Sequence, residues 1–243
     1  MQKMFKPVVA LFLSTLFTLP AFAQEQQDKK ERSARPDIPG KFLFDLGVNL
    51  AMNQPDKGFK AGFWGSRTAN LAYYLPIRIG ESKFSLNPGI GMSMERFKWA
   101  NFYLLQDTTD NAEVYDLIPN KIYPGLKKSQ LVMNYLEFPI EFRFDANPAD
   151  PARTFWATIG GRLSLLATAH TKVKYKVDGD VNKIKDQSSF GLSPVRFAAT
   201  VRFGVAGFGW FVNYNLTPVF QKGMGPSGTD MTVLTAGITI NGL

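Results

Sequence analysis

The chain has 243 residues, of which 45% are hydrophobic, 20% are charged and 14% are aromatic, with no cysteine and a single histidine, His170. Without cysteine there is no disulfide scaffold, iron–sulfur cluster, thiol nucleophile or Cys-containing zinc site. One histidine likewise excludes a multi-histidine metal centre. We therefore expect neither a metal nor a cofactor, and the formal net charge of +8 needs another explanation.

The first 23 residues have the features of a secretory signal peptide. A basic start precedes an apolar stretch from Val8 to Leu19, and Ala21-Phe22-Ala23 fits a small-x-small cleavage site. Residues 24–40 are polar and balanced in charge, which predicts a flexible periplasmic N-terminal segment. Export of a cysteine-free chain suits the bacterial envelope, and it argues against a nucleic-acid partner.

Apolar and polar side chains alternate with a period of two from residue 41 to residue 243. In one strand Phe197 and Val201 fall on one face, while Arg196 and Arg202 fall on the other. About eight such strands of roughly 10 residues follow one another, a length that suffices to cross a bilayer at a tilt. The alternating segments are 42–50, 70–79, 84–95, 136–144, 154–177, 195–206, 210–217 and 234–241. We predict an all-β, transmembrane, antiparallel up-and-down β-barrel over residues 41–243.

Three features favour a barrel in lipid over a soluble, lipocalin-like barrel. The polar face is mostly Gly, Ser, Thr, Asn and Ala, as in a crowded interior. Short and long connections alternate strictly, which is typical of outer-membrane barrels with short periplasmic turns and long extracellular loops. Aromatic residues gather at both ends of the outer face and predict two interfacial belts. One belt comprises Phe42, Phe84, Phe144, Phe155 and Trp210, and the other comprises Trp99, Tyr135, Tyr175 and Phe220.

Acidic and basic residues nearly balance on the inward face. Charges in such an interior persist only when they are paired, so we predict an ion-pair network across the lumen. Its members are Asp45, Arg78, Glu95, Glu137, Glu141, Arg143, Arg162, Arg196 and Arg202. We favour a network that plugs the barrel, and a proton or small-ion path is the alternative.

A basic strand end, His170 to Lys176, carries the next candidate site. Lys172, Lys174 and Lys176 share the inward parity and are expected to project above the membrane, where they suit lipopolysaccharide phosphates or an acidic partner. A solvated strand extension is the simpler interpretation. His170 is the one candidate general base, but its expected inward parity and the lack of a nearby serine argue against a lipid-modifying enzyme.

The longest connection, residues 99–130, is rich in apolar and aromatic residues. Loops of this length are commonly functional, and an apolar loop suggests a protein-contact surface. Packing of the loop over the barrel mouth explains the same composition. Both interpretations remain open at this stage.

A family resemblance rests on the segment Asn134-Tyr135-Leu136-Glu137-Phe138-Pro139-Ile140-Glu141-Phe142-Arg143-Phe144 and on Gly160-Gly161-Arg162-Leu163-Ser164 in the next strand. With the signal peptide and about eight strands, these segments resemble the small outer-membrane β-barrel family of Bacteroidota that includes PorT. The resemblance extends from Lys41 onward and marks a barrel strand rather than an activity. It implies an envelope location and, for PorT-like members, a role in type IX protein secretion.

We therefore predict a non-enzymatic integral outer-membrane barrel with a plugged lumen. Its expected partners are outer-membrane lipid, lipopolysaccharide, and proteins of secretion or envelope assembly that meet its extracellular loops. The alternative functions are a narrow channel and a small lipid A-modifying enzyme.

Overall fold

The computed structural model describes residues 40–53, 65–99, 103–107, 114–150 and 153–242. Residues 39–243 form one compact unit. The predicted signal peptide, residues 1–23, lies outside the described residues, and so does the predicted N-terminal segment, residues 24–40, apart from Gly40.

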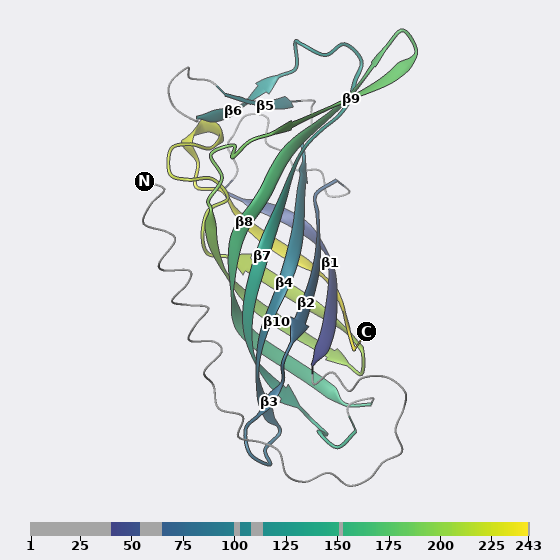
Figure 1. Cartoon of the computed structure of the whole chain (residues 1–243), viewed down its shortest axis with the longest axis vertical. Helices are drawn as coiled ribbons and strands as arrows, with labels where there is room; N and C mark the ends of the chain where they lie inside the picture. The colour runs from purple at the N-terminus through teal and green to yellow at the C-terminus, as the bar shows by residue number, and fades with distance from the viewer. Residues whose placement is uncertain (1–39, 54–64, 100–102, 108–113, 151–152, 243) are drawn as a thin grey trace. The chain divides into compact units, whose positions relative to one another are not determined.

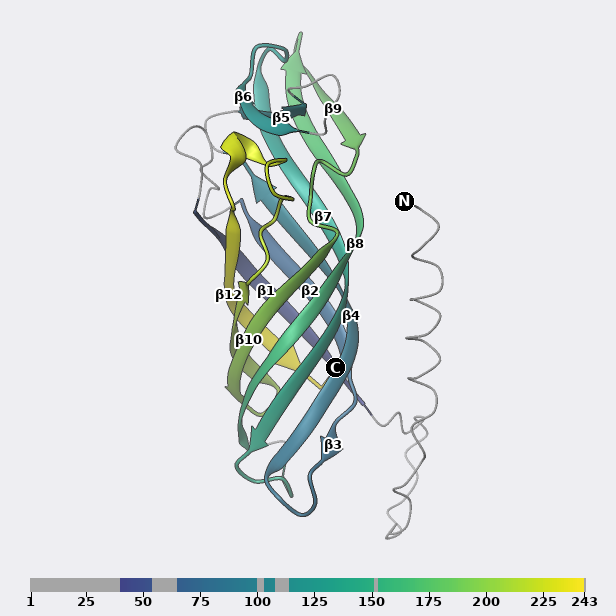
Figure 2. The ribbon, with the colours of Figure 1, turned by 90° about the vertical axis from the view of Figure 1, so that its left-hand side faces the viewer.

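Eight antiparallel strands form a closed ring, as predicted, and each pairs with the ring strands before and after it in the chain (Figures 1 and 2). The last strand pairs with the first from Leu43–Asn241 to Met52–Thr232, which closes the ring. The ring strands are β1 (Lys41–Met52), β2 (Arg67–Tyr74), β4 (Phe84–Lys98), β7 (Leu126–Asp145), β8 (Phe155–Val177), β10 (Val195–Val205), β11 (Phe208–Asn215) and β12 (Thr232–Asn241).

The outward face of the ring is apolar and the inward face is polar, as expected for a barrel in lipid. On β10, Phe197 and Val201 are 55% and 47% exposed, whereas Arg196 and Arg202 are 1% and 2% exposed. Exposed apolar side chains such as Met92 recur on the outward face of the other ring strands. An exposed apolar wall around a barrel is unstable in water and is covered by a bilayer. The barrel is therefore a transmembrane one, and the soluble alternative is wrong.

The two ends of the barrel differ in the length of their connections. At one end, which we call the short-turn end, tight turns around Gly80 and Ala206 join neighbouring strands, and the short β3 (Ile77–Arg78) pairs with β4. The other end, the long-loop end, carries β5 (Tyr103–Asp107), β6 (Tyr115–Pro119), β9 (Asp180–Gln187) and the 3-10 turn η1 (Pro226–Gly228) (Figure 1). No described helix is long and apolar enough to cross a membrane.

A β-bulge in β8 reverses the orientation of the side chains that follow it. Leu166 pairs with Tyr135 and Thr168 with Asn134, which leaves Ala167 without a partner in the ladder. Leu166 and Ala169 consequently both pack on the interior apolar cluster although they are three residues apart. The inward parity predicted for His170, Lys172, Lys174 and Lys176 is wrong, because one extra residue moves every later side chain to the other face.

Candidate functional site

The lumen near the short-turn end is crossed by a three-residue ion-pair group. Arg202 on β10 donates from Nη1 to Asp45 Oδ1 on β1 over 2.6 Å, and from Nε to Glu141 Oε1 on β7 over 2.8 Å. All three side chains are almost completely buried. Tyr74 Oη and Thr158 Oγ1 donate to the two oxygens of Glu141 over 2.8 and 2.9 Å. Arg202 thus ties together strands that are not neighbours in the ring.

Two further ion pairs lie in the lumen. Arg196 Nη1 on β10 lies 2.9 Å from Glu95 Oε2 on β4, again across the ring, and its guanidinium lies over the Tyr135 ring at 4.9 Å. Arg162 Nη1 on β8 lies 3.0 Å from Glu137 Oε2 on the adjacent β7. Each charge is buried and compensated, which is the condition for its survival in such an interior.

Two residues predicted for this network lie apart from the cross-lumen pairs. Arg143 pairs with Asp145, two residues along β7, over 2.8 Å. Arg78 is exposed and donates to the carbonyl oxygens of Ser82 and Pro148. Arg78 therefore does not belong to the network, because β3 ends at the rim of the barrel, where solvent reaches the guanidinium.

A cavity of about 150 Å³ lies at the short-turn end, and Arg78, Arg143, Arg202 and Trp156 are among its lining residues. Arg143 lies over the Trp156 ring at 4.6 Å. Glycine at 204 and at 209 makes room for this indole, since a Cβ there would come within 2.7 and 2.9 Å of the ring. Arg202 lines the cavity and also holds the buried ion pairs, so the cavity is bounded by the lumen network.

Toward the long-loop end the lumen is filled by apolar side chains, which we call the apolar seal. Its members are Ala51, Phe97, Trp99, Leu105, Tyr115, Leu117, Leu131, Met133, Tyr135, Ala169, Phe190, Leu192, Val219, Phe220, Met231 and Val233. Phe97, Leu131 and Met133 are completely buried. The seal continues the inward face of β4 and β7 beyond Glu95 and Glu137, so the interior changes from polar to apolar along the same strands.

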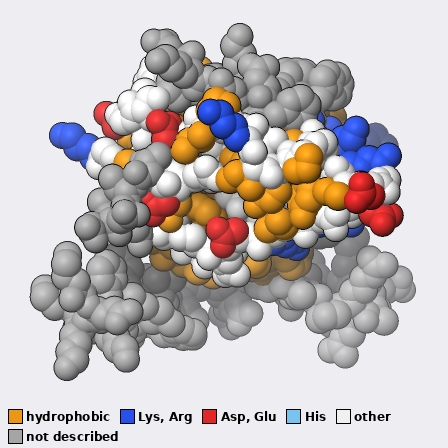
Figure 3. All heavy atoms as spheres, turned by 90° about the horizontal axis from the view of Figure 1, so that it is seen from above, with side chains coloured by type: hydrophobic (Ala, Val, Ile, Leu, Met, Phe, Trp, Pro, Cys, Tyr) orange, Lys and Arg blue, Asp and Glu red, His pale blue; other side chains and the backbone are white. Residues whose placement is uncertain are grey.

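The described part of the 99–130 loop contributes to this seal. Leu105 on β5 and Leu117 on β6 are buried in it, and the Tyr115 ring lies 5.5 Å from the Phe190 ring. These side chains support self-packing over the barrel mouth rather than a free apolar contact surface. Viewed onto this end, hydrophobic side chains occupy much of the centre (Figure 3).

The predicted aromatic belt at the long-loop end is wrong. Trp99, Tyr135 and Phe220 belong to the apolar seal and are 3%, 1% and 2% exposed, and Tyr175 packs on Tyr123 with ring centroids 4.9 Å apart. Trp99 and Tyr135 share the inward parity of Glu95 and Glu137, which places them inside. The belt at the short-turn end is present, since Phe42, Phe84, Phe155 and Trp210 are 40–50% exposed on the outer wall, and the fifth predicted member, Phe144, is half-buried.

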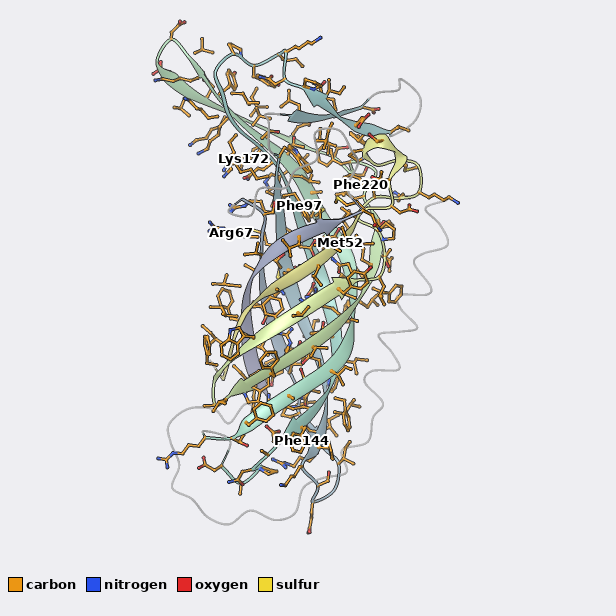
Figure 4. All side chains as sticks on the ribbon, turned by 180° about the vertical axis from the view of Figure 1, so that it is seen from behind. Met52, Arg67, Phe97, Phe144, Lys172 and Phe220 are labelled. Atoms are coloured by element: carbon orange, nitrogen blue, oxygen red, sulfur yellow. The ribbon has the colours of Figure 1, made fainter. Side chains whose placement is uncertain are left out.

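The outer wall at the long-loop end carries basic side chains instead of aromatic ones. Lys128 lies directly opposite Lys174, which lies opposite Lys183, and Lys172 lies opposite Lys185. Arg67 and Lys172 lie on the same side of the barrel (Figure 4). We call this surface the basic face, and its members are Arg67, Arg96, Lys98, Lys128, Lys172, Lys174, Lys183 and Lys185. Lys176 follows on the same side, exposed and farther out.

Crowding of like charges changes the chemistry of the basic face. Desolvation, and after it the charges of Arg96 and Lys174, lowers the pKa of Lys128 from its usual 10.5. Desolvation, and after it Lys174 and Lys185, lowers the pKa of Lys172 in the same direction. Lys128 and Lys172 therefore hold their positive charges less readily than isolated lysines do.

His170 lies on the outer wall beside the basic face, opposite Val132 and Gln187. Desolvation, followed by the charges of Lys185 and Lys172, lowers the pKa of His170 from its usual value. Its outward position removes the parity objection to a lipid-modifying enzyme. Among the described residues, no side-chain hydrogen bond joins His170 to a hydroxyl or a carboxylate.

No protein-family model matches the chain, and no curated protein matches it. Among solved structures, the attachment invasion locus protein Ail of Yersinia pestis is similar at 11% identity over 83% of this chain and 97% of that chain, with a TM-score of 0.35. Neisserial surface protein A (NspA) is similar at 11% identity over 84% and 97%, with a TM-score of 0.33. Ail in complex with the heparin analogue sucrose octasulfate is similar at 10% identity over 83% and 97%, with a TM-score of 0.32. With TM-scores of 0.32–0.35, these similarities carry no argument about the fold or the function of this chain.

Proposed function

We propose that this protein is a non-enzymatic integral protein of the bacterial outer membrane with a closed lumen, and that it assists protein secretion or envelope assembly through its long-loop end. The main observation behind the proposal is that two groups of side chains fill successive parts of the lumen. The Arg202 group and the neighbouring ion pairs occupy one part, and the apolar seal occupies the next. A barrel filled in this way acts through its surfaces rather than by conducting solutes.

The orientation that we propose places the short turns and the N-terminus in the periplasm and the long loops outside the cell. It rests on the habit of outer-membrane barrels, whose periplasmic turns are short, and on the signal-peptide features of residues 1–23. The long-loop end then presents β5, β6 and β9 to extracellular or secreted partners.

The secretion role that we propose is of the type IX kind and rests on the PorT-like segment from Asn134 to Phe144. The inward residues of that segment meet lumen partners, Glu137 with Arg162 and Glu141 with Arg202. The segment therefore serves the closed lumen, while the partner specificity resides in the loops.

Cross-linking and affinity purification from outer membranes, with a deletion strain alongside, test the accessory role. We expect proteins of a secretion or assembly machine to be recovered with the barrel, and secreted cargo to accumulate in the periplasm of the deletion strain. Recovery of the protein alone, with normal secretion and normal outer-membrane assembly, would contradict the role.

A narrow proton or ion path is the second candidate. It is favoured by buried lumen groups that have no hydrogen-bond partner in the protein, including Ser93 Oγ, Arg162 Nε and Arg196 Nε, because such groups commonly bind internal water. Planar-bilayer recordings separate the two functions. The closed lumen predicts no stable unitary steps, and steps abolished by Arg196→Met would establish the path instead.

A lipid A-modifying activity is tested by mass spectrometry of lipid A from cells with and without the protein. We expect identical lipid A species. A mass change in lipid A that disappears in a His170→Ala variant would replace the accessory role with an enzymatic one.

A further inference from the structure

The basic face begins where the apolar outer wall ends. On the outward side of β4, Met92 and Met94 are 64% and 51% exposed, and Arg96 and Lys98 are the next two outward residues. Four residues of strand cover about 13 Å. The change from thioether to ammonium over this distance matches the change from acyl chains to headgroups at the edge of a bilayer.

The rows of the basic face set like charges against one another. Residues directly opposite on antiparallel strands have Cβ atoms about 5 Å apart, and like charges in that arrangement repel. Lys128, Lys174 and Lys183 form one row across three strands, and Lys172 and Lys185 form part of the next. No carboxylate lies on the basic face as the described residues form it. A ligand with several negative charges would relieve this repulsion.

A buried amide lies in the middle of the face. Gln130 stands between Lys98 and Lys172 in its row and is 4% exposed. Its side-chain oxygen has no hydrogen-bond partner in the protein. This oxygen is also shielded from solvent, so the amide lies beneath the face and the lysines around it form the accessible surface.

We propose that the basic face binds the phosphorylated headgroup of a lipid in the membrane leaflet at the long-loop end, with the phosphates of lipid A as the probe. The lysine ammonium groups contact the phosphates, and the acyl chains lie on the apolar wall beside Met92 and Met94. The binding site is on the outside of the barrel, so it does not depend on any path through the lumen.

The site rests on the outer-membrane location proposed above, because that membrane supplies such a lipid. The two proposals fail separately. Loss of lipid binding from a closed barrel that recovers secretion partners refutes the site alone, and stable unitary conductance with intact lipid binding refutes the closed lumen alone.

The test measures, by native mass spectrometry, the binding of bisphosphorylated lipid A, dephosphorylated lipid A and inorganic pyrophosphate to the full chain in non-ionic detergent. We expect binding of the bisphosphorylated lipid to be at least about tenfold tighter than that of the dephosphorylated lipid. The combined variant Lys128→Gln, Lys172→Gln, Lys174→Gln should bind the bisphosphorylated lipid roughly 100-fold more weakly, at about fivefold for each lysine.

The matched control removes three charges through Lys83→Gln, Lys121→Gln and Lys222→Gln, all at exposed positions that do not belong to the face. It should bind like the parent chain. Heat-modifiable migration on gels verifies that each variant is folded. Equal binding of the two lipids, equal loss in the control, or pyrophosphate binding as tight as that of the lipid would overturn the proposal, and the last result would identify a soluble-anion site.

Discussion

The two halves of the barrel distribute polar and apolar side chains in opposite ways between the lumen and the outer wall. Near the short-turn end the lumen holds Arg202 and its carboxylates, and the outer wall is apolar with an aromatic belt. Near the long-loop end the lumen holds the apolar seal, and the outer wall formed by β4, β7, β8 and β9 carries the basic face. The first arrangement is that of a protein in lipid and the second that of a protein in water. The reversal therefore locates the edge of the membrane on the barrel.

The two halves also close the lumen through different interactions, ion pairs in one and apolar packing in the other. A buried ion-pair group is stable only when complete, because each charge has lost its hydration. An apolar seal depends on tight packing and loses free energy in proportion to the cavity that a truncation leaves. Substitutions in the two halves should therefore fail in different ways.

Removal of the central charge in the polar half should have the largest effect. Arg202→Met leaves Asp45 and Glu141 buried without their cation, and we expect a loss of about 3–5 kcal/mol in the free energy of unfolding. Urea unfolding in lipid vesicles, followed by tryptophan fluorescence, measures it. The exposed control Arg153→Met should lose less than about 0.5 kcal/mol.

The same site distinguishes charge from packing. Addition of Asp45→Asn and Glu141→Gln to Arg202→Met removes the unpaired charges, so most of the lost stability should return. A triple variant that is as unstable as the single variant would show that the group acts by packing alone, and the contrast between the halves would fail.

Truncation in the apolar half should cost somewhat less. Leu131 is completely buried in the seal, and Leu131→Ala should lower the free energy of unfolding by about 2–5 kcal/mol. Val181→Ala on β9, at a position 57% exposed, is the control and should change it by less than about 0.5 kcal/mol. Similar values for both variants would mean that the seal is loosely packed.

On the outer wall, the cost of introducing a lysine should depend on how deep the position lies in the membrane. Ile159 is 62% exposed on the apolar wall, and Ile159→Lys should cost about 2–4 kcal/mol if this position lies near the bilayer midplane. Val181→Lys continues the outward side of the basic face and should cost about 0–1 kcal/mol. Folding titrations in vesicles compare the two, and equal costs would place both positions at the same depth.

The alternation of side chains along the strands predicted most of the half near the short-turn end. Period-two alternation located eight strands and assigned Asp45, Glu95, Glu137 and Glu141 to the interior, because registers without irregularities preserve parity from one end of a strand to the other. The sequence alone did not predict which arginine pairs with which carboxylate across the ring. Arg202 and Asp45 are far apart in the chain, and their contact depends on ring closure between β1 and β12.

The half near the long-loop end was predicted less well, and a β-bulge is one reason. The bulge at Ala167 reverses the parity of His170 and of the lysines after it, and no proline or glycine at that position signals it. One available signal was the sequence of β4, where inward Glu95 gives way to Phe97 while outward Met94 gives way to Arg96. That exchange of residue types on both faces at once marks the reversal directly.

Membrane depth along β4 tests the reversal most directly, and the cysteine-free chain allows single labels without background. Nitroxide labels at Ile90→Cys, Met94→Cys and Lys98→Cys are measured in vesicles by relaxation with oxygen and with a water-soluble nickel chelate. We predict that labels at 90 and 94 respond to oxygen and that the label at 98 responds to nickel. A label at 98 as oxygen-rich and nickel-poor as the label at 90 would contradict the account.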